Sequence, residues 1–453
     1  MLEYGIFPAA QFINRGKFWS KAREFRKLQW LPQVELERRQ MERFRRIVAH
    51  ANENVPFYRK RFKEEGFSPD ELRTNDDISR IPILKKEEIR KNFSQMVATN
   101  IKSERWKLDS TSGSSGEPLI FYRDSATDDL KVASDIMMNT WCGIEPGDRI
   151  LWITHPRQIK VKNVTDYVVR LLWNNATDLR WMSVNGLQEE SAEAIVRFID
   201  KIKPRCLYGY ASGLLMLAKC FDKRKSHPNY VRAIISSSET LSSFSKKILE
   251  ETFDCDTFNR YGLRELGGSV AQDCQKHNGL HVNSELYSME AVKNGQLVSP
   301  RVRGQLVVTD LNNMVMPFIR YQTGDLALYD EPSCSCERGF PTISEIVGRE
   351  TEFINIRTPS GKIITHPGYF LVLGDFVKDI KNFQFVQERL DELTLKIVPS
   401  GNLDLATSEK IRKFMNYYFG TEVKVTLEIV EEIPPEASGK RPIVKSKIPF
   451  EPS

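Results

Sequence analysis

The chain has 453 residues, of which 40% are hydrophobic and 28% charged, with a net charge of +6 at pH 7. This length exceeds what one hydrophobic core usually serves, so we expect two or more domains, and the composition excludes a disordered chain. No run of about 18 apolar residues predicts a membrane-spanning helix, and residues 1–19 lack the features of a signal peptide.

Most of the positive charge lies near the N-terminus, in a helical, basic extension that we place at residues 1–60. Between Arg15 and Arg46, eleven Lys or Arg face four acids, so the rest of the chain is nearly neutral and no general polyanion-binding surface is expected. We interpret the stretch as the solvated face of a helix. The alternative is a peripheral contact with anionic lipid or a phosphorylated substrate, helped by Phe18, Trp19, Phe25 and Trp30. No recognition motif for nucleic acid accompanies these residues.

The first two thirds of the chain read as an α/β fold. Helical spacing runs from Val34 to Asn52, Pro56 ends that helix, and a short charged helix follows the break at residues 82–86. Helices at 189–202, 213–221 and 241–253 then alternate with strands at 206–210 and 231–236. This alternation predicts a parallel sheet covered by helices on both faces.

From about Gly304 the pattern changes to strands, at 305–309 and 317–321. After Gly348 we expect strands at 383–387, 393–398 and 423–430 and a helix at 408–419. These elements predict a small C-terminal α/β domain, residues 349–453, after a large N-terminal domain, residues 1–348. The boundary falls near Arg349 to Glu352.

One loop packs four hydroxyls and two glycines into eight residues, ending in Glu117-Pro118. Its first six residues are Thr111, Ser112, Gly113, Ser114, Ser115 and Gly116. Glycines let successive N–H groups converge into an anion-binding nest, and hydroxyls add donors for phosphate oxygens. No Lys-Ser/Thr follows, so this is not a Walker sequence. A Ser/Gly-rich stretch is more often a flexible surface loop, but residues 118–122 read as a strand at its end.

Four further clusters carry chemistry of the same kind. In Arg260-Tyr-Gly-Leu-Arg-Glu265, a ring beside Gly262 could face a base and the glutamate could hold Mg²⁺. In Arg320-Tyr-Gln-Thr-Gly-Asp325, a carboxylate at a strand end could accept from two ribose hydroxyls, although Thr-Gly-Asp is also ordinary turn chemistry. Gly348-Arg349 alone is a turn with a solvated arginine. Lys440 follows a flexible Ser438-Gly439, as a mobile lysine would need.

Of the seven cysteines, most stand singly in apolar surroundings, which favours a reducing, cytoplasmic location. Cys334 and Cys336 form a tight pair. Together with Cys274 and either His281 or His277, they would make a Cys₃His set typical of structural zinc. The alternative is reduced surface cysteines on a loop.

The order of these clusters resembles the adenylate-forming superfamily of acyl-CoA synthetases. Within it, the chain is similar to the phenylacetate–CoA ligase group and its capsular-polysaccharide-biosynthesis relatives. The resemblance runs from about Glu53 to Lys447 and includes the clusters above. It also includes Asn54-Val-Pro-Phe-Tyr-Arg, Pro82-Ile-Leu-Lys and Ser238-Glu239.

The resemblance implies roles for the motif residues. Ser112 to Gly116 would wrap the ATP phosphates, while Ser237, Ser238, Glu239 and Tyr261 would line the adenine pocket. Glu265 would bind Mg²⁺, Asp325 the ribose hydroxyls, and Arg349 the ribose or a phosphate beside a hinge. Lys440 would swing in on a mobile C-terminal domain to stabilise charge during adenylation. Arg264 departs from the family's usual Thr or Ser; it would either contact the α-phosphate or point away.

These roles imply ATP-dependent activation of a carboxylic acid to an acyl-adenylate, then acyl transfer to CoA. One alternative is a ligase that transfers its acyl group to an amine, a hydroxyl or a carrier protein in polysaccharide or natural-product biosynthesis. Another is a non-catalytic nucleotide-binding scaffold, although the presence of Glu265, Asp325 and Lys440 counts against it. We expect the acid near residues 208–212 and 152–155, no nucleic-acid partner, and a homodimer as is common in the group.

Overall fold

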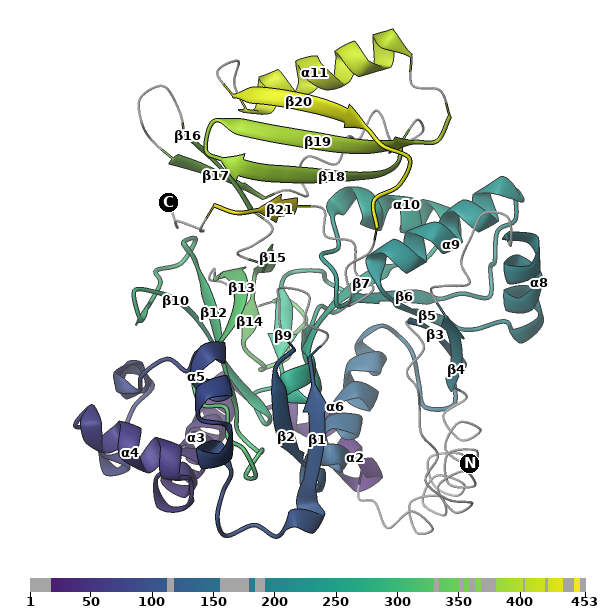
Figure 1. Cartoon of the computed structure of the whole chain (residues 1–453). Helices are drawn as coiled ribbons and strands as arrows, with labels where there is room; N and C mark the ends of the chain where they lie inside the picture. The colour runs from purple at the N-terminus through teal and green to yellow at the C-terminus, as the bar shows by residue number, and fades with distance from the viewer. Residues whose placement is uncertain are drawn as a thin grey trace.

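The computed structural model describes residues 18–111, 118–154, 179–183, 192–329, 334–349, 353–357, 363–367, 380–401, 404–419, 423–434 and 444–448. Two large sheets lie side by side, and a smaller sheet with α11 lies above them in Figure 1. Within these residues no helix is long and apolar enough to cross a membrane. The predicted α/β class is confirmed.

The eight-stranded sheet forms one half of the large body. Its strands, in spatial order, are β14 (Thr342–Ile343), β9 (Leu280–Val282), β8 (Gly268–Gln272), β7 (Thr257–Leu263), β6 (Ala233–Ser237), β5 (Cys206–Gly209), β3 (Ile150–Thr154) and β4 (Leu179–Ser183). The run from β7 to β4 is parallel, whereas β8, β9 and β14 pair antiparallel. Helices α8 (Ala192–Ile202), α9 (Ala211–Lys223) and α10 (Ser243–Phe253) share a core with one face of this sheet. Helix α6 (Asp128–Trp141) approaches the other face, as predicted for a sheet covered on both sides.

The five-stranded sheet is antiparallel and lies beside the first. Its strands, in spatial order, are β11 (Gln296–Leu297), β10 (Tyr287–Lys293), β12 (Arg303–Asp310), β13 (Tyr321–Leu328) and β15 (Glu345–Arg349). A two-stranded hairpin, β1 (Trp106–Ser110) and β2 (Ile120–Asp124), lies between the two sheets in Figure 1. The strand predicted at 317–321 is wrong except at its last residue: residues 317–320 precede β13, which begins at Tyr321, because Pro317 lacks an N–H and Arg320 has a φ of 48°.

Four helices surround the N-terminal side of the large body. They are α2 (Phe18–Leu28), α3 (Gln33–Asn54), α4 (Pro56–Glu64) and α5 (Lys86–Lys91). Part of the basic charge of α3 is structural, because Arg39 and Arg43 both bond the Glu285 carboxylate, whose side chain is 1% exposed. The predicted helix therefore buries some of its cations as well as displaying others.

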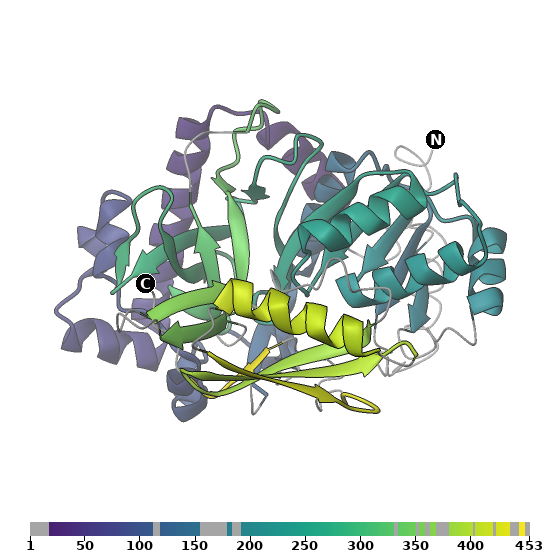
Figure 2. The ribbon, with the colours of Figure 1, turned by 90° about the horizontal axis from the view of Figure 1, so that it is seen from above.

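The C-terminal elements form their own sheet and core. A hairpin of β16 (Phe353–Arg357) and β17 (Ile363–Pro367) precedes the four-stranded sheet. Its strands, in spatial order, are β20 (Lys424–Ile429), β19 (Glu392–Pro399), β18 (Ile380–Arg389) and β21 (Val444–Ser446). Helix α11 (Leu405–Phe419) packs on this sheet through Ile411 and Met415 (Figure 2). Strands β18, β19 and β20 and helix α11 were predicted, whereas β16, β17 and β21 were not. The domain boundary near residue 349 stays a prediction.

Candidate functional site

The β1–β2 hairpin brackets the predicted phosphate loop. Thr111 donates its N–H to the Leu119 carbonyl, and Leu119 donates its N–H to the Thr111 hydroxyl, both at 2.9 Å. These two bonds fix the ends of the loop at one point on the hairpin. The loop residues Ser112, Gly113, Ser114, Ser115 and Gly116 lie outside the described residues.

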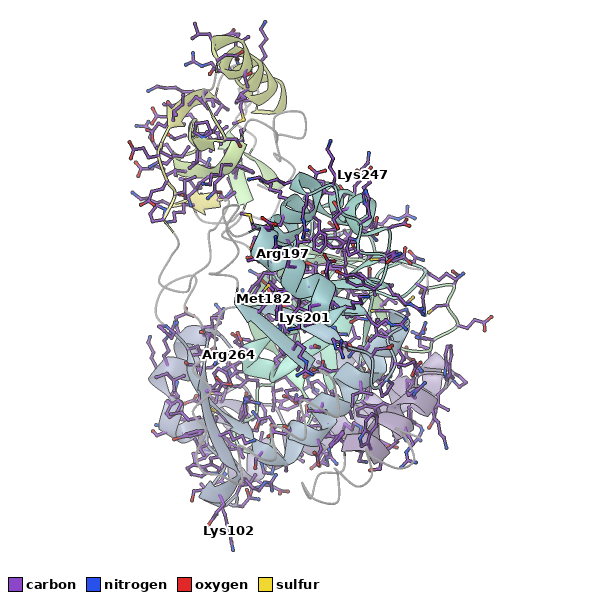
Figure 3. All side chains as sticks on the ribbon, turned by 90° about the vertical axis from the view of Figure 1, so that its right-hand side faces the viewer. Lys102, Met182, Arg197, Lys201, Lys247 and Arg264 are labelled. Carbon is purple, nitrogen blue, oxygen red and sulfur yellow. The ribbon has the colours of Figure 1, made fainter. Side chains whose placement is uncertain are left out.

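Arg264 is bonded to this hairpin. Its Nε donates to Asp109 Oδ1 at 2.9 Å, and Asp109 also accepts from Arg123 at 3.0 Å. Arg264 lies in the short 3₁₀ turn η9 (Arg264–Leu266) that follows β7, and it is labelled in Figure 3. The pair therefore ties the turn carrying Glu265 to the strand that leads into the phosphate loop. Asp109 was missed in the sequence, since a lone acid in a strand predicts no partner.

Two tyrosine–carboxylate bonds join β7 and η9 to β13. Tyr261 on β7 donates its hydroxyl to Asp325 Oδ2 at 2.5 Å. Tyr321 donates its hydroxyl to Glu265 Oε1 at 2.8 Å, and both of these side chains are buried. Burial and the Asp325 charge raise the pKa of Tyr261 well above its usual value, so the phenol stays a donor. The structure thus brings together the predicted residues of two separate motifs.

Tyr321 is a second residue that motif reasoning left without a role. Tyr321, Thr323 and Asp325 stand at alternate positions of β13, and all three are buried. A register shift opposite Leu306 and the φ of 84° at Gly324 interrupt the regular alternation of faces between them. The spacing of two residues was the signal available in the sequence, and the hydrogen bonds to Glu265 and Tyr261 place the two side chains.

The N-terminal motifs hold β13 and the segment before it. Leu84 exchanges backbone hydrogen bonds with Arg320 and Gln322, at 2.9 Å each. Lys86 donates to the Thr323 carbonyl at 3.0 Å, beside Gly324, whose φ is 84°. Tyr58 donates to the Pro317 carbonyl at 2.9 Å and accepts from the Ile319 N–H. The Asn54 and Pro82 motifs are therefore part of the scaffold that positions Asp325.

The Arg320 guanidinium is buried and hydrogen-bonded inside the protein. Its guanidinium bonds both carboxylate oxygens of Glu290, at 3.2 and 3.0 Å, and also donates to the carbonyls of Ser79, Ile81 and Gly295. Only 1% of its side chain is exposed. Within its motif, Arg320 is a structural clamp, whereas the Asp325 carboxylate accepts from Tyr261.

A buried lysine supports the turn that carries Glu265. Lys131 on α6 bonds Asp310 Oδ2 and the Tyr287 hydroxyl, both at 2.8 Å, and the Tyr287 hydroxyl donates to the Leu266 carbonyl at 2.9 Å. Burial is the largest effect on the pKa of Lys131 and lowers it. The lysine stem lies under Gly267, whose φ of 84° favours glycine at the end of the turn. This network fixes the backbone of η9 from behind.

The residues predicted around the base are placed as follows. Ser237 ends β6 and is buried, and Ser238 follows with a φ of 69°. Glu239 accepts from the Ser212 N–H at 2.8 Å and from its hydroxyl at 3.0 Å, so its carboxylate caps the N-terminus of α9. Gly262 approaches β8 so closely that a Cβ would lie 2.9 Å from the Gly268 carbonyl oxygen.

The remaining predicted residues lie nearer the C-terminus. The backbone register pairs Arg349 on β15 with Asp325 on β13, and the Arg349 side chain is outside the described residues. Lys440 also lies outside them.

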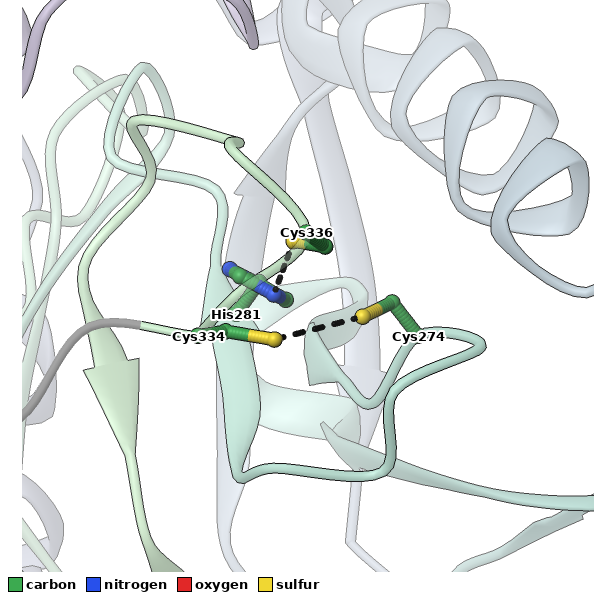
Figure 4. A group of neighbouring side chains, drawn as sticks. All are labelled: Cys274, His281, Cys334 and Cys336. Carbon is green, nitrogen blue, oxygen red and sulfur yellow. Dashed lines mark hydrogen bonds between the residues drawn. The ribbon is translucent and has the colours of Figure 1, made fainter.

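A cysteine–histidine cluster lies at the edge of the eight-stranded sheet. The donor atoms of Cys274, His281, Cys334 and Cys336 all lie within 4.8 Å of one another. The Cys274 and Cys334 sulfurs are 3.6 Å apart, and Cys336 Sγ lies 3.2 Å from His281 Nε2. Figure 4 shows the four side chains pointing toward one another. None of the seven cysteines is in a disulfide.

The cluster's geometry suits a tetrahedral ion. Zn–S bonds of about 2.3 Å and Zn–N bonds of about 2.0 Å imply ligand-to-ligand separations of roughly 3.5–3.8 Å. His281 Nδ1 lies 3.3 Å from the Phe340 carbonyl, which directs Nε2 toward the sulfurs. His277 instead bonds Asp273 at 2.8 Å. Of the two histidines considered from sequence, the structure brings His281 into the cluster.

Comparisons with known proteins agree with the motifs. Residues 356–447 match the family model described as the CapK C-terminal domain. The chain is 27% identical over 384 residues to a phenylacetate-coenzyme A ligase of Thermus thermophilus, covering 82% of this chain and 83% of the relative. It is 23% identical over 408 residues to Protein CapK of Staphylococcus aureus, covering 89% and 87%.

The fold has a solved counterpart as well. A crystal structure of 2-hydroxyisobutyryl-CoA ligase in the postadenylation state, in complex with R3-HIB-AMP, matches with a TM-score of 0.76 at 21% identity. The match covers 93% of this chain and 91% of that one. Together these findings confirm that the chain resembles the phenylacetate–CoA ligase and CapK group of the adenylate-forming superfamily in sequence and in fold.

Proposed function

We propose that the chain is an ATP-dependent acid–thiol ligase that converts a carboxylic acid to its acyl-adenylate with release of pyrophosphate and then transfers the acyl group to CoA. The observation that carries this proposal is the meeting of Tyr261 with Asp325 and of Glu265 with Tyr321, beside the phosphate-loop hairpin. Relatives named phenylacetate-coenzyme A ligase and solved CoA ligases that hold acyl-AMP support it.

Asp325 and Glu265 have the properties that their proposed roles need. Asp325 is an acceptor for vicinal ribose hydroxyls, and Tyr261 holds one of its oxygens so that the carboxylate has a fixed orientation. Glu265 offers an oxygen ligand for Mg²⁺, oriented by Tyr321, and Mg²⁺ when bound would neutralise phosphate charge. Attack on phosphorus depends on such charge neutralisation and positioning more than on covalent help.

The other proposed nucleotide contacts come from backbone groups and from side chains. Ser112 to Gly116 are proposed to bind the β- and γ-phosphates, and Thr111 bonds Leu119 where this segment meets the hairpin. Ser237, Ser238, Tyr261 and Gly262 line the adenine pocket. Glu239 contributes its backbone there, because its carboxylate already caps α9.

Arg264 acts on the site through the hairpin in this proposal. Its bond to Asp109 is the interaction that the structure offers, and it joins η9 to β1. A role in keeping Glu265 and the phosphate loop at a fixed separation fits that bond better than a direct contact with the α-phosphate.

Lys440 and the hinge complete the proposed reaction. The lysine would approach the α-phosphorus during adenylation on a C-terminal domain that begins near Arg349, and then leave room for the thiol. The separate core of the C-terminal sheet supports a body able to move as a unit.

The CapK-like sequence of residues 356–447 keeps the alternative acceptor open: an amine, hydroxyl or carrier protein in place of CoA.

We also propose that Cys274, His281, Cys334 and Cys336 hold a structural zinc ion. The Cys₃His donor set, the spacing of the donor atoms and the Phe340 carbonyl behind His281 support it. Thiolate–zinc ligation and seven free cysteines fit a reducing, cytoplasmic setting. The homodimer remains a prediction. The peripheral contact of the N-terminal helices loses its expected aromatic support, because Phe18, Trp19 and Phe25 are buried in the core, while Trp30 is exposed.

Metal analysis tests the zinc proposal. Purified wild type should contain close to one zinc per chain, Cys334→Ser should lose it, and Cys255→Ser, at a half-buried cysteine outside the cluster, should keep it. Wild type without metal, or equal zinc in Cys334→Ser, would contradict the proposal.

An ATP–pyrophosphate exchange screen tests the function. The panel contains aryl and short aliphatic acids, each as its unsubstituted, hydroxy and amino form, with CoA added or omitted. Acid-dependent exchange without CoA, and thioester formation only with CoA, is the expected result. Exchange without thioester would favour the alternative acceptor, and no exchange with any acid would reject the proposed activity.

A further inference from the structure

Three elements from separate parts of the chain meet at the ammonium group of Lys131, near the N-terminus of α6. Tyr287 and Asp310 are register partners at the ends of β10 and β12, so their side chains lie next to each other. The Lys131 ammonium donates to both, at 2.8 Å each. Only 10% of the Lys131 side chain and 3% of the Asp310 side chain are exposed, and Tyr287 is fully buried. Solvent therefore offers little replacement for a hydrogen bond lost in this cluster.

The hydrogen bonds at the Tyr287 hydroxyl have one possible direction. An ammonium group has three protons and no acceptor, so the Tyr287 oxygen accepts from Lys131. The hydroxyl proton is then left for the Leu266 carbonyl, 2.9 Å away. Burial raises the pKa of Tyr287 well above its usual value, so the phenol keeps that proton. Lys131 thus acts through Tyr287 on Leu266, the last residue of η9.

Leu266 directly follows Glu265, the proposed Mg²⁺ ligand. The turn closes with the Gly267 N–H donating to the Arg264 carbonyl at 3.0 Å. A Cβ at Gly267 would lie 3.2 Å from Lys131 Cε, so the lysine stem packs against the end of the turn. One side chain therefore contacts the turn directly and also holds its last carbonyl through a tyrosine.

Asp310 gives the Tyr287 proton a second possible acceptor. Its Oδ1 accepts from two backbone N–H groups in the segment that follows β12, at 2.9 and 3.3 Å, whereas Oδ2 is bonded to Lys131. Removing the ammonium would leave Oδ2 as a buried charged acceptor without its donor, beside its register partner Tyr287. A hydrogen bond to a charged acceptor is stronger than one to a neutral carbonyl, so the hydroxyl would turn from Leu266 toward Asp310. The charge of Lys131 therefore decides which acceptor Tyr287 uses.

We propose that Lys131 is a positioning residue for the ligase reaction. It directs the Tyr287 hydroxyl to the Leu266 carbonyl, and the bonded carbonyl holds the turn in which Glu265 would bind Mg²⁺. The lysine contacts neither substrate nor metal in this role. The proposal rests on the proposed adenylation activity, because it acts through Glu265.

The test uses three substitutions and measures two quantities. Lys131→Met keeps an unbranched stem and removes the charge, Tyr287→Phe removes the hydroxyl, and Asp310→Asn removes the competing charge. The first quantity is the Mg²⁺ concentration that gives half-maximal ATP–pyrophosphate exchange. The second is the deuterium uptake of the peptide that contains residues 264–268, measured by mass spectrometry on the full chain without nucleotide or metal. The uptake reports on η9 without requiring activity.

Lys131→Met and Tyr287→Phe should each raise the Mg²⁺ requirement roughly three- to tenfold and speed deuterium uptake, because both lose the bond to Leu266. Their double variant should be no worse than either variant alone. Lys131→Met/Asp310→Asn should recover most of both losses, because a neutral amide competes less for the Tyr287 proton and can donate to the Tyr287 oxygen. Adding Tyr287→Phe to that pair should cancel the recovery. Lys246→Met, at an ion-paired lysine of α10 outside this cluster, should change neither quantity.

Two results would overturn the proposal: additive losses in Lys131→Met/Tyr287→Phe, or a Lys131→Met loss that Asp310→Asn leaves unchanged. Either result would mean that the lysine supports the fold without acting through Tyr287. Absence of pyrophosphate exchange with every acid would reject the ligase itself, while deuterium uptake would still decide whether Lys131 controls η9. If Lys131→Met alone fails to fold, Lys131→Met/Asp310→Asn is compared with and without Tyr287→Phe, and equal deuterium uptake in the two would overturn the proposal.

Discussion

The bond between Tyr321 and Glu265 gives a sharp test of how the proposed Mg²⁺ ligand is held. Tyr321→Phe removes one hydroxyl from a fully buried ring and leaves the ring itself in place. A hydrogen bond to a charged group contributes about 1.5–3 kcal/mol, so losing it should weaken Mg²⁺-dependent catalysis roughly ten- to a hundredfold. Removing an outer partner of a metal-binding side chain has effects of the same order.

The assay is ATP–pyrophosphate exchange as a function of Mg²⁺ concentration. We expect Tyr321→Phe to raise the Mg²⁺ concentration needed for half-maximal rate and to lower kcat/KM for ATP. The matched control is Tyr230→Phe, because Tyr230 also donates to a carboxylate, that of Asp200 on α8, at 2.8 Å, and neither residue belongs to the candidate site. Both variants should lose some stability. If both shift the Mg²⁺ requirement equally, or neither does, the reasoning about Glu265 is refuted.

Three other variants follow from the same structure. Lys440→Ala should abolish pyrophosphate exchange while ATP binding by calorimetry stays largely intact, and unchanged pyrophosphate release would refute its role. Glu285→Gln should reduce the free energy of unfolding in urea by about 3–5 kcal/mol, because two arginines lose a buried partner. Glu35→Gln, at an exposed pair with Arg38, should change it far less. Arg264→Thr should lower kcat/KM less than about tenfold, since it removes one partly exposed pair with Asp109; complete inactivity would instead indicate a direct contact with the phosphates.

Several regular elements of the large body could be predicted from sequence, because periodicity and prolines define them directly. The helix expected at Val34–Asn52 is α3, and the helix expected at 241–253 is α10, each within two residues at either end. Helix α6 and strands β8 to β10 were not predicted. The strand expected at 317–321 failed up to residue 320, because Phe318 and Ile319 fill the core around Tyr58 without joining a ladder. Apolar content alone does not distinguish the two cases.

The candidate site could be predicted only where its residues stand in recognisable motifs. Asp325 and Glu265 stand in such strings, whereas Asp109 is a single acid in a strand. Its partner, Arg264, lies 155 residues away along the chain. A pairing at that distance depends on the packing of β1 against η9, which local patterns do not report.

The position of the cysteine–histidine cluster links it to the nucleotide site. The chain leaves the eight-stranded sheet after β9, builds β10 to β13 of the five-stranded sheet, and returns through Cys334 and Cys336 to β14, which pairs with β9. Cys274 and Cys334 are 60 residues apart. An ion bound by this cluster would close a loop that contains both Tyr321 and Asp325. Closing a loop of that length lowers the conformational entropy of the unfolded chain, which stabilises the fold by about 4 kcal/mol. Chelators or thiol oxidants would then act on the proposed ATP binding from a distance, by loosening the base of the sheet that carries Asp325.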